Sequence, residues 1–252
     1  MHGMESLRMM RRTLRARLLN RRLENKNFTL ISDDCWGGSV YRELGLPYLS
    51  PFIGLFVPPI CFMQLLKNLR RYMSYKPIFV ESSRFDGVNK LRSNNKYNIN
   101  YPIAILGEDV ELHFVHYANA AEASEKWKRR TGRINWDNML VKLIEWIPWC
   151  EDAGMEILEE FDSLQYPKKI CFTWRNYPQL KSAIWLEGLP KLQETMIDLN
   201  ATQMQFDVVN WINNGSKECG RMTAVANKLL HGSLTNFLRR RSLRRMNCLP
   251  TP

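Results

Sequence analysis

Short runs rich in β-branched and aromatic residues alternate along this chain with longer segments whose apolar residues recur at helical spacing. This alternation predicts a layered α/β domain, in which helices cover both faces of a central sheet. The runs "YPIAILG" and "VELHFVHY" are separated only by Glu108 and Asp109, which favours a hairpin or another tight antiparallel pair. The expected fold is therefore a three-layer α/β/α arrangement with a mixed central sheet. The seven expected strands lie in residues 28–32, 77–82, 101–107, 110–117, 138–146, 168–174 and 182–188.

The helical segments differ in how clearly their ends are marked. Residues 58–75 open with two prolines and keep apolar residues at helical spacing, which predicts one helix. Residues 119–133 open with Asn119, a favourable N-cap. The polar segment 84–101, rich in Asn and Lys, is predicted to be a loop. Further helices are expected in residues 37–46, 150–165, 201–214 and 223–238.

The charge of the chain is concentrated at its two ends. Of a net charge of +11, residues 1–26 and residues 228–252 each carry +6, which leaves −1 for residues 27–227. A length of 252 residues allows one large domain or two small ones, and we find no linker long enough to divide the chain. We therefore expect a basic N-terminal arm in residues 1–26, an α/β domain in 27–215, and a helical, basic C-terminal extension in 216–252.

The basic ends suggest a membrane more than a nucleic acid as partner. A nucleic-acid-binding protein usually carries its basic face on the folded domain itself, whereas here the body is nearly neutral. Basic arms are attracted to an anionic membrane surface, where each Lys or Arg contributes about 1 kcal/mol. Met9, Leu14, Leu18, Leu19 and Leu23 partly segregate from the arginines, as in an interfacial helix. A solvated tail that only aids solubility would explain the same charges.

One uncharged segment, residues 44–66, is long enough to span a bilayer. It contains four prolines that prevent a continuous helix, so we expect a buried loop followed by the start of a helix, with a lipid-facing surface as the alternative. The arginine-rich start is not followed by an apolar stretch and cleavage site, so no secretory signal is predicted. The six irregularly spaced cysteines form no CxxC, which favours reduced thiols and a cytoplasmic protein.

The segment "ISDDCWGGSV" is the first candidate site, because it follows the first expected strand and precedes a helix. Asp33 or Asp34 could accept a proton, bind a metal or hydrogen-bond a sugar hydroxyl. Gly37 and Gly38 would let the backbone turn sharply or approach a ligand. The segment matches neither GxGxxG nor GxxxxGK[ST], so no nucleotide fingerprint is present. The structural alternative is that one aspartate caps the helix and the glycines only shape the turn.

The two histidines of "VELHFVHY" are the second candidate. In a continuous strand His113 and His116 point to opposite faces, so they are poor joint metal ligands. His116, at the far end, is the better candidate for a general base, because imidazole titrates near neutrality. A buried, hydrogen-bonded histidine is the alternative for either residue. Cys35 and the histidines show no recognisable metal-ligand spacing, so we assign no metal, and the residues identify no cofactor.

The basic segment "EKWKRRTGRINWDN" is the third candidate. Lys126 and Arg130 are four residues apart, as are Arg129 and Arg133, so each pair shares a helix face. Such a face could receive a phosphate or carboxylate, or it could be an ordinary solvated surface. Trp136, just before the next expected strand, could stack on a sugar or belong to the core.

Three long segments, in order, resemble the signature blocks of a bacterial family of domains of unknown function whose members are often labelled exopolysaccharide or capsule biosynthesis proteins. They are "FTLISDDCWGGSVYRELGLPYLSPFIGLF", "YPIAILGEDVELHFVHY" and "EKWKRRTGRINWDNMLVKL". The resemblance covers roughly residues 27–215. It implies a three-layer α/β/α fold and a setting in the synthesis of cell-surface glycans, without catalytic residues to carry over. Relatives often have Asn where this chain has Asp33 and Asp34, so a scheme that needs both carboxylates departs from the family pattern.

Because these blocks end at strand termini, we expect one site where the first strand, the hairpin and the next helix converge. The predicted function is a cytoplasmic, membrane-peripheral transferase that moves a glycosyl or related group from a nucleotide-sugar or lipid-linked sugar during surface-polysaccharide synthesis. The alternative is a non-catalytic scaffold protein of a polysaccharide-assembly complex, with residues 44–66 as its contact surface. The candidate catalytic residues are Asp33, Asp34 and His116, and the candidate substrate-binding residues are Cys35, Trp36, Gly37, Gly38, His113, Tyr117, Arg130, Arg133, Asn135 and Trp136.

Overall fold

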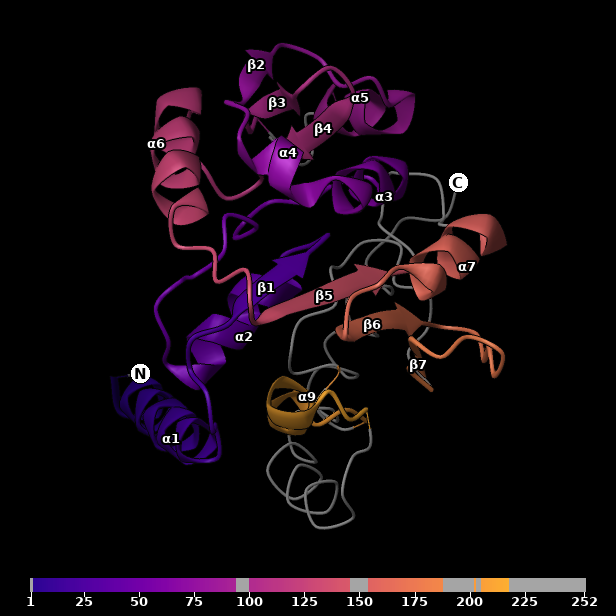
Figure 1. Cartoon of the computed structure of the whole chain (residues 1–252). Helices are drawn as coiled ribbons and strands as arrows, with labels where there is room; N and C mark the ends of the chain where they lie inside the picture. Colours follow the sequence, from indigo (N-terminus) through magenta and orange to yellow (C-terminus); the bar gives the residue numbers. More distant parts are fainter. Residues whose placement is uncertain (1, 94–99, 146–153, 188–201, 203–204, 218–252) are drawn as a thin grey trace, which may run out of the picture.

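The strands in the described part of the chain form two separate sheets. The computed structural model describes residues 2–93, 100–145, 154–187, 202 and 205–217 (Figure 1). One sheet is parallel, with the strand order β1 (Thr29–Ser32), β5 (Met139–Ile144), β6 (Lys168–Thr173) and β7 (Ala183–Trp185). The other is antiparallel, with the order β2 (Ile78–Val80), β3 (Ile103–Leu106) and β4 (Val110–His113).

Helices cover both faces of the parallel sheet (Figure 1). One face carries α2 (Trp36–Leu44) and α9 (Val208–Asn214), and the other carries α3 (Pro59–Lys67) and α7 (Met155–Ser163). The N-terminal helix α1 (His2–Arg21) packs on the outside of α2. The remaining helices lie around the antiparallel sheet and are α4 (Leu69–Met73), α5 (Asp86–Ser93) and α6 (Ala120–Thr131).

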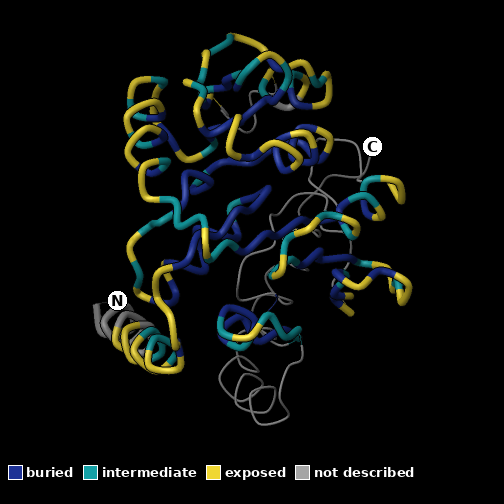
Figure 2. Tube along the Cα trace, viewed as in Figure 1, coloured by how far each residue is buried: buried dark blue, intermediate teal, exposed yellow. Residues whose placement is uncertain are grey.

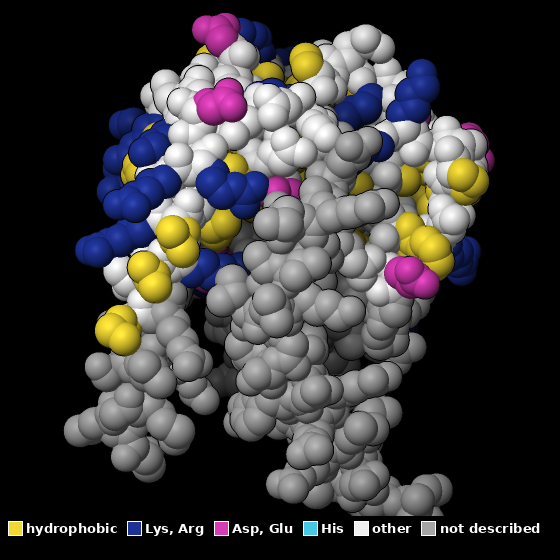
Figure 3. Space-filling view, turned by 90° about the horizontal axis from the view of Figure 1, so that it is seen from below, with side chains coloured by type: hydrophobic (Ala, Val, Ile, Leu, Met, Phe, Trp, Pro, Cys, Tyr) yellow, Lys and Arg dark blue, Asp and Glu magenta, His cyan; other side chains and the backbone are white. Residues whose placement is uncertain are grey.

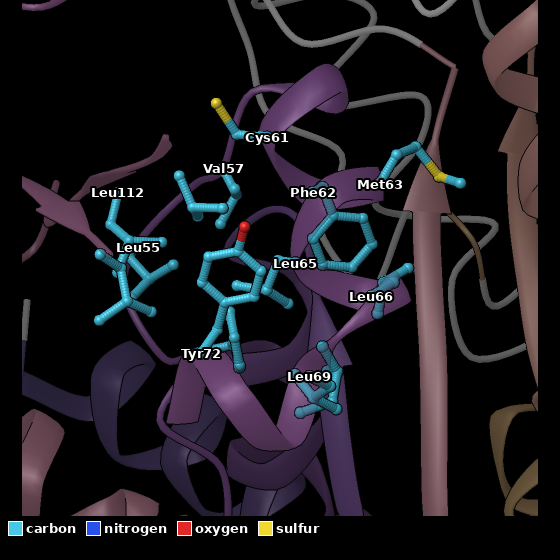
Figure 4. Packing of buried hydrophobic residues seen from close by; sticks show 14 of the residues in the cluster. Leu55, Val57, Cys61, Phe62, Met63, Leu65, Leu66, Leu69, Tyr72 and Leu112 are labelled. Carbon is cyan, nitrogen blue, oxygen red and sulfur yellow. The ribbon is translucent and has the colours of Figure 1, made fainter. Parts of the chain in front are cut away.

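Alternating strand residues divide the core into two clusters, one on each face of the parallel sheet. Ile31, Val141 and Leu143 face α3 and α7, and this cluster continues into the antiparallel sheet (Figure 4). Leu30 and Leu140 face the opposite way, toward α2 and α9. The central strands β5 and β6 are buried except at their first residues, whereas Met10, Leu14 and Leu18 of α1 are exposed, as are the outer faces of α5 and α6 (Figure 2). The predicted α/β class is confirmed.

The antiparallel strands do not join the parallel sheet, and the segment between the two sheets explains why. The N–H of Val57 donates to the carbonyl of Asp33 (2.7 Å), and Phe56 exchanges two backbone hydrogen bonds with His113 (3.0 Å each). On the outer edge of β1, the Tyr41 hydroxyl accepts from Leu30 N and donates to the carbonyl of Phe28. The free edge of β1 is thereby occupied, so no hairpin strand pairs with it.

The middle of the uncharged segment 44–66 contributes to this junction rather than to the surface. Its residues 50–59 are buried apart from a half-buried Gly54, and the following Ile60 is exposed. The expectation of a buried loop followed by a helix is therefore correct. The alternative of a lipid-facing surface is wrong for residues 50–59, because they are buried. Within the part of the chain that the structure describes, no helix combines the length and apolarity needed to cross a membrane.

Three local features differ from the sequence-based expectations. The helix expected over 58–75 is interrupted at Asn68, whose backbone (φ −138°, ψ 43°) leaves the helical region between α3 and α4. The strand expected over 110–117 ends at His113, because the chain turns and Tyr117 N donates to the carbonyl of Phe114. The segment 84–101 contains a helix, α5, within its first part. The helix expected over 223–238 lies outside the described residues.

Candidate functional site

Two aspartates follow β1 directly, and both are fully buried against a lysine of the neighbouring strand. The Lys142 Nζ donates to Asp33 Oδ1 (3.1 Å) and lies 2.7 Å from Asp34 Oδ2. Lys142 is brought there by the register of the parallel sheet, in which it stands beside Ser32, the last residue of β1. All three side chains have essentially no exposed surface, so they form a buried triad of two carboxylates and one ammonium group.

The other carboxylate oxygens of the triad hold the backbone. Asp33 Oδ2 accepts from the N–H of Ile144 (3.0 Å), which ties the end of β1 to the end of β5. Asp34 Oδ1 accepts from the N–H of Trp36 and from Ser32 Oγ, each at 3.0 Å, and so it holds the first residue of α2. Cys35 is the N-cap of α2 and makes no side-chain cap bond, so the first helical N–H is satisfied by Asp34, one residue before the cap.

Burial sets the protonation of this triad. Desolvation, reinforced by the charge of Asp34 and opposed by Lys142, raises the pKa of Asp33 to about 7. Burial opposes the charge on Lys142 as well, but the two carboxylates prevail and raise the pKa of its ammonium group. Lys142 is therefore charged at neutral pH, while the Asp33 carboxyl is close to its midpoint. None of the three groups can contact a substrate in this conformation, because none is exposed.

The two glycines lie in the first turn of α2 and allow close packing. A Cβ on Gly37 would lie 3.0 Å from Ser32 Cβ, and one on Gly38 would lie 3.4 Å from Ile53 Cγ2. Trp36 is buried as well, with its Nε1 donating to Thr202 Oγ1 (3.1 Å). In this structure the Trp-Gly-Gly sequence therefore packs α2 against β1 and against the segment before Val57.

Cys35 is the partly exposed member of the first candidate segment. Burial, with a further contribution from the Asp34 charge, raises the pKa of its thiol to about 12. The Sγ atom points toward the carbonyl of Leu55 (3.9 Å). Cys35 is a protonated thiol at neutral pH, so it can line a site but is a poor nucleophile.

Of the two candidate histidines, His116 is the exposed one, and it lies beside the same segment. Gly54, with φ of +73°, approaches it so closely that a Cβ on Gly54 would lie 3.1 Å from His116 Cβ. Partial burial and the nearby positive charge of Arg42 lower the pKa of the His116 imidazole. Gly38 packs on Ile53 and Gly54, and His116 packs on Gly54 as well. Gly54 therefore links the first turn of α2 to His116. His116 is therefore neutral at pH 7 and able to accept a proton.

Tyr117 and Arg130 form a second polar contact next to His116. Arg130 Nη1 donates to the Tyr117 hydroxyl (2.6 Å), which in turn donates to the carbonyl of Ile53. The Arg130 guanidinium also lies over the ring of Tyr48, 5.1 Å from its centroid. Arg130 is only 7% exposed, so its charge is largely committed to these partners. Arg42, on the outer face of α2, is exposed, and its charge is close enough to affect His116.

Asn135 and Trp136 are placed elsewhere, and Arg133 reaches the junction only through Tyr48. The N–H of Asn135 donates to Thr29 Oγ1 (2.8 Å), at the first residue of β1, and Arg133 Nη1 donates to the carbonyl of Tyr48. Trp136 lies under the guanidinium of Arg70, 4.3 Å from the ring centroid. Asn135 thus lies at the amino end of β1, whereas Asp33 and Asp34 lie at its carboxyl end. The structure does not bring these residues into one cluster.

His113 belongs to a separate buried cluster in the antiparallel sheet. Its Nε2 lies 2.7 Å from Glu111 Oε1, and its Nδ1 lies 3.3 Å from the Tyr101 hydroxyl. Glu111, also fully buried, accepts from Ser83 Oγ and from the N–H of Arg84. Burial by itself favours a neutral Glu111, but the hydrogen bonds from these partners lower its pKa, while burial lowers the pKa of His113. These contacts hold β4 against the segment that precedes α5.

Three charged residues of these sites were not predicted from the sequence, namely Lys142, Glu111 and Arg42. The first two carry a signal that could have been used, since each is a charged residue inside an apolar strand, in "MLVKLI" and "VELH". A charge at such a position is rarely buried without a partner, and so it points to one. Arg42 carries no such signal. Among the described residues, no group of three or more His, Cys, Asp or Glu side chains is arranged to hold a metal ion.

Comparison with known proteins places nearly the whole described body in one family. A family model described as a domain of unknown function, DUF1919, matches residues 6–213. An uncharacterised protein of Haemophilus influenzae is 31% identical over 206 residues, which cover 79% of this chain and 90% of that protein. The matched region begins within α1 and ends within α9.

Proposed function

The chain belongs to the DUF1919 family, and we propose that it is a transferase that moves a glycosyl or related group during the synthesis of cell-surface polysaccharide. The proposed donor is a nucleotide-sugar or a lipid-linked sugar, and the proposed location is the cytoplasmic face of the membrane. The observation that carries the proposal is the junction at the carboxyl end of β1, where Cys35, the first turn of α2 and His116 come together. Ligands of open α/β sheets bind at such strand ends.

In this proposal His116 is the catalytic base. It is exposed, and its lowered pKa leaves the imidazole neutral and ready to take the proton of an acceptor hydroxyl. Arg42 is the group that binds a phosphate of the donor, since it is exposed and its charge is close enough to affect His116. Cys35 lines the site as a neutral thiol.

Asp33, Asp34 and Lys142 are positioning residues in this scheme. The triad fixes the end of β1 to β5 through Ile144 N and fixes the start of α2 through Trp36 N. Both carboxylates are fully buried, so their contribution is to hold Cys35 and the first turn of α2 in place.

The scaffold alternative requires a different surface from the one first expected. Residues 50–59 are buried between the two sheets, so they are not available as a contact face. A non-catalytic role would have to use another part of the surface, and it predicts that changes at His116 leave partner binding and polysaccharide production intact.

The test measures donor binding and polysaccharide output in the same variants. Titration of the purified full-length protein with nucleotide-sugars and polyprenyl-phosphate sugars should show a binding partner whose affinity falls about tenfold or more in Arg42→Gln, the loss of one charge-assisted phosphate contact. His116→Ala should keep that affinity and abolish polysaccharide production in a complemented deletion strain.

Two exposed positions away from the junction are matched controls. Lys90→Gln removes an exposed cation from α5, and Ser124→Ala truncates an exposed side chain on α6. Both should behave as the unaltered protein does. If no sugar donor binds, or if His116→Ala and Arg42→Gln support normal polysaccharide production, the transferase proposal is wrong.

A further inference from the structure

Helix α1 presents two opposite faces, and one of them packs on the body. Asn20 Nδ2 donates to the carbonyl of Leu44 (2.9 Å), and Leu23 just after the helix is buried. At Gly45 the approach is close, since a Cβ there would lie 3.8 Å from Ala16 Cβ. These contacts determine which side of α1 is turned away from the body.

The outward side carries an apolar row. Met10, Leu14 and Leu18 recur every four residues and are 63%, 58% and 53% exposed. Residues at this spacing lie above one another along a helix, so the row extends for about 12 Å. Exposed apolar side chains scattered singly need no explanation, but a regular row on a single helix marks a contact surface. No described element covers it.

The charge around this row indicates what covers it. Arg17 and Arg21 are exposed and fall within the same sector of the helix as the apolar row, because they lie three residues after Leu14 and Leu18. Between Glu5 and Glu24 the sequence has no acidic residue and seven arginines. Figure 3 shows apolar and basic side chains interspersed along one flank of the face viewed from below. An exposed apolar row with arginines in the same sector of the helix complements an anionic lipid surface.

We propose that the outer face of α1, formed by Met10, Leu14, Leu18, Arg17 and Arg21, docks the protein onto the surface of an anionic bilayer. This inference makes the membrane-peripheral part of the proposed function specific, and it rests on that part alone. The helix lies in the plane of the interface, with the apolar row among the lipid chains and the guanidinium groups at the phosphates. The body of the protein is then held with α2 next to the membrane-bound helix.

Vesicle sedimentation of the full-length protein tests this inference. Binding to vesicles of mixed phosphatidylglycerol and phosphatidylcholine should greatly exceed binding to phosphatidylcholine alone and should weaken with salt. The variant Met10→Gln/Leu14→Gln/Leu18→Gln keeps every charge and a good helix-forming residue at each site. Its affinity for the vesicles should fall by at least about tenfold, because its apolar anchor is lost. Arg17→Gln/Arg21→Gln should lose about fivefold per charge, the equivalent of about 1 kcal/mol each.

Ile60→Gln is the matched control, because Ile60 is 61% exposed in the first turn of α3, outside the proposed surface, and should leave binding unchanged. Circular dichroism verifies that each variant is folded. Equal vesicle binding by the triple variant and the unaltered protein would overturn the proposal, because the basic C-terminal residues would then account for the binding. Concentration-dependent dimerisation that the triple variant abolishes would also overturn it, since a second copy would then cover the row. Sugar-donor binding by the triple variant should be unchanged, which separates this test from that of the proposed function.

Discussion

At the residue scale, the most informative feature is a buried lysine between two buried carboxylates. Lys142 lies within ion-pair distance of Asp33 and Asp34, and none of the three is exposed. Charges without water are stable only when they are paired and hydrogen-bonded, so the three residues depend on each other. The sequence showed the two aspartates plainly, but it could not show that their partner lies more than a hundred residues later.

Removing the lysine should destabilise the protein strongly. Lys142→Met leaves two buried carboxylates without a counter-charge, and we expect a loss of about 3–5 kcal/mol in the free energy of unfolding, measured by urea denaturation at pH 7. Lys67→Met is the control, since Lys67 pairs with Glu160 at an exposed site and should cost about 1 kcal/mol or less. Equal losses in the two variants would show that the buried triad is not a special source of stability.

The raised pKa of Asp33 predicts a pH effect of defined sign. Between its unfolded value near 3.8 and its folded value of about 7, Asp33 binds more proton in the folded state. Its contribution to the free energy of unfolding is therefore largest at low pH and is lost as the pH rises through this window. Asp33→Asn should remove that loss, a change on the order of a few kcal/mol between pH 4 and pH 7.

Urea midpoints at several pH values measure this difference. The exposed Asp137→Asn variant is the control and should follow the unaltered protein. If Asp33→Asn shows the same pH profile as the unaltered protein, then Asp33 is ionised throughout the window and its pKa is not raised. The lowered pKa of His113 has the opposite effect and reduces the stability of the protein as the pH falls. This contribution is the same in the unaltered protein and in Asp33→Asn, so it cancels from their difference.

At the scale of elements, α2 shows how closely a helix can approach its strand. Gly37 faces Ser32, and Gly38 faces Ile53, so the two glycines pack the helix between β1 and the segment that joins the sheets. The sequence predicted a strand, a polar turn and a helix here, and the element order is correct. It left open whether the glycines served a ligand or packing, and the distances show packing.

The two glycines should respond differently to alanine. A Cβ at position 37 would lie 3.0 Å from Ser32 Cβ, so Gly37→Ala overpacks the contact and should cost about 1–3 kcal/mol. Gly38→Ala makes an ordinary contact with Ile53 at 3.4 Å and gains up to about 1 kcal/mol of helix propensity, so it should be close to neutral. Thermal unfolding of both variants measures the two changes in stability. A neutral Gly37→Ala would mean that α2 can move away from β1 without loss.

At the scale of the whole molecule, a buried segment bonds to both of the sheets that the described residues form. Phe56 pairs with His113 through the backbone and stacks on its ring, with centroids 4.1 Å apart, while the next residue, Val57, bonds to Asp33. One core cluster runs from the parallel sheet to the antiparallel sheet through this junction. Such continuity predicts that both sheets unfold together.

Truncating the junction tests this cooperativity. Phe56 is fully buried, so Phe56→Ala should cost about 3–5 kcal/mol. Hydrogen exchange should show the same loss of protection for amides of β3 and β4 as for those of β5 and β6. If protection fell only in the antiparallel sheet, the two sheets would be separate folding units.

The sequence by itself determined the α/β class, the succession of strands and helices along the chain, and the separation of basic ends from a neutral body. These follow from hydrophobic periodicity, turn residues and charge, all of which are local properties of the chain. Only the tertiary structure decided which residues meet. It paired Lys142 with Asp33 and Asp34, put Asn135 at the opposite end of β1, and gave the hairpin a sheet of its own. Strand register and the burial of charged side chains depend on contacts between distant segments, and no local pattern encodes them.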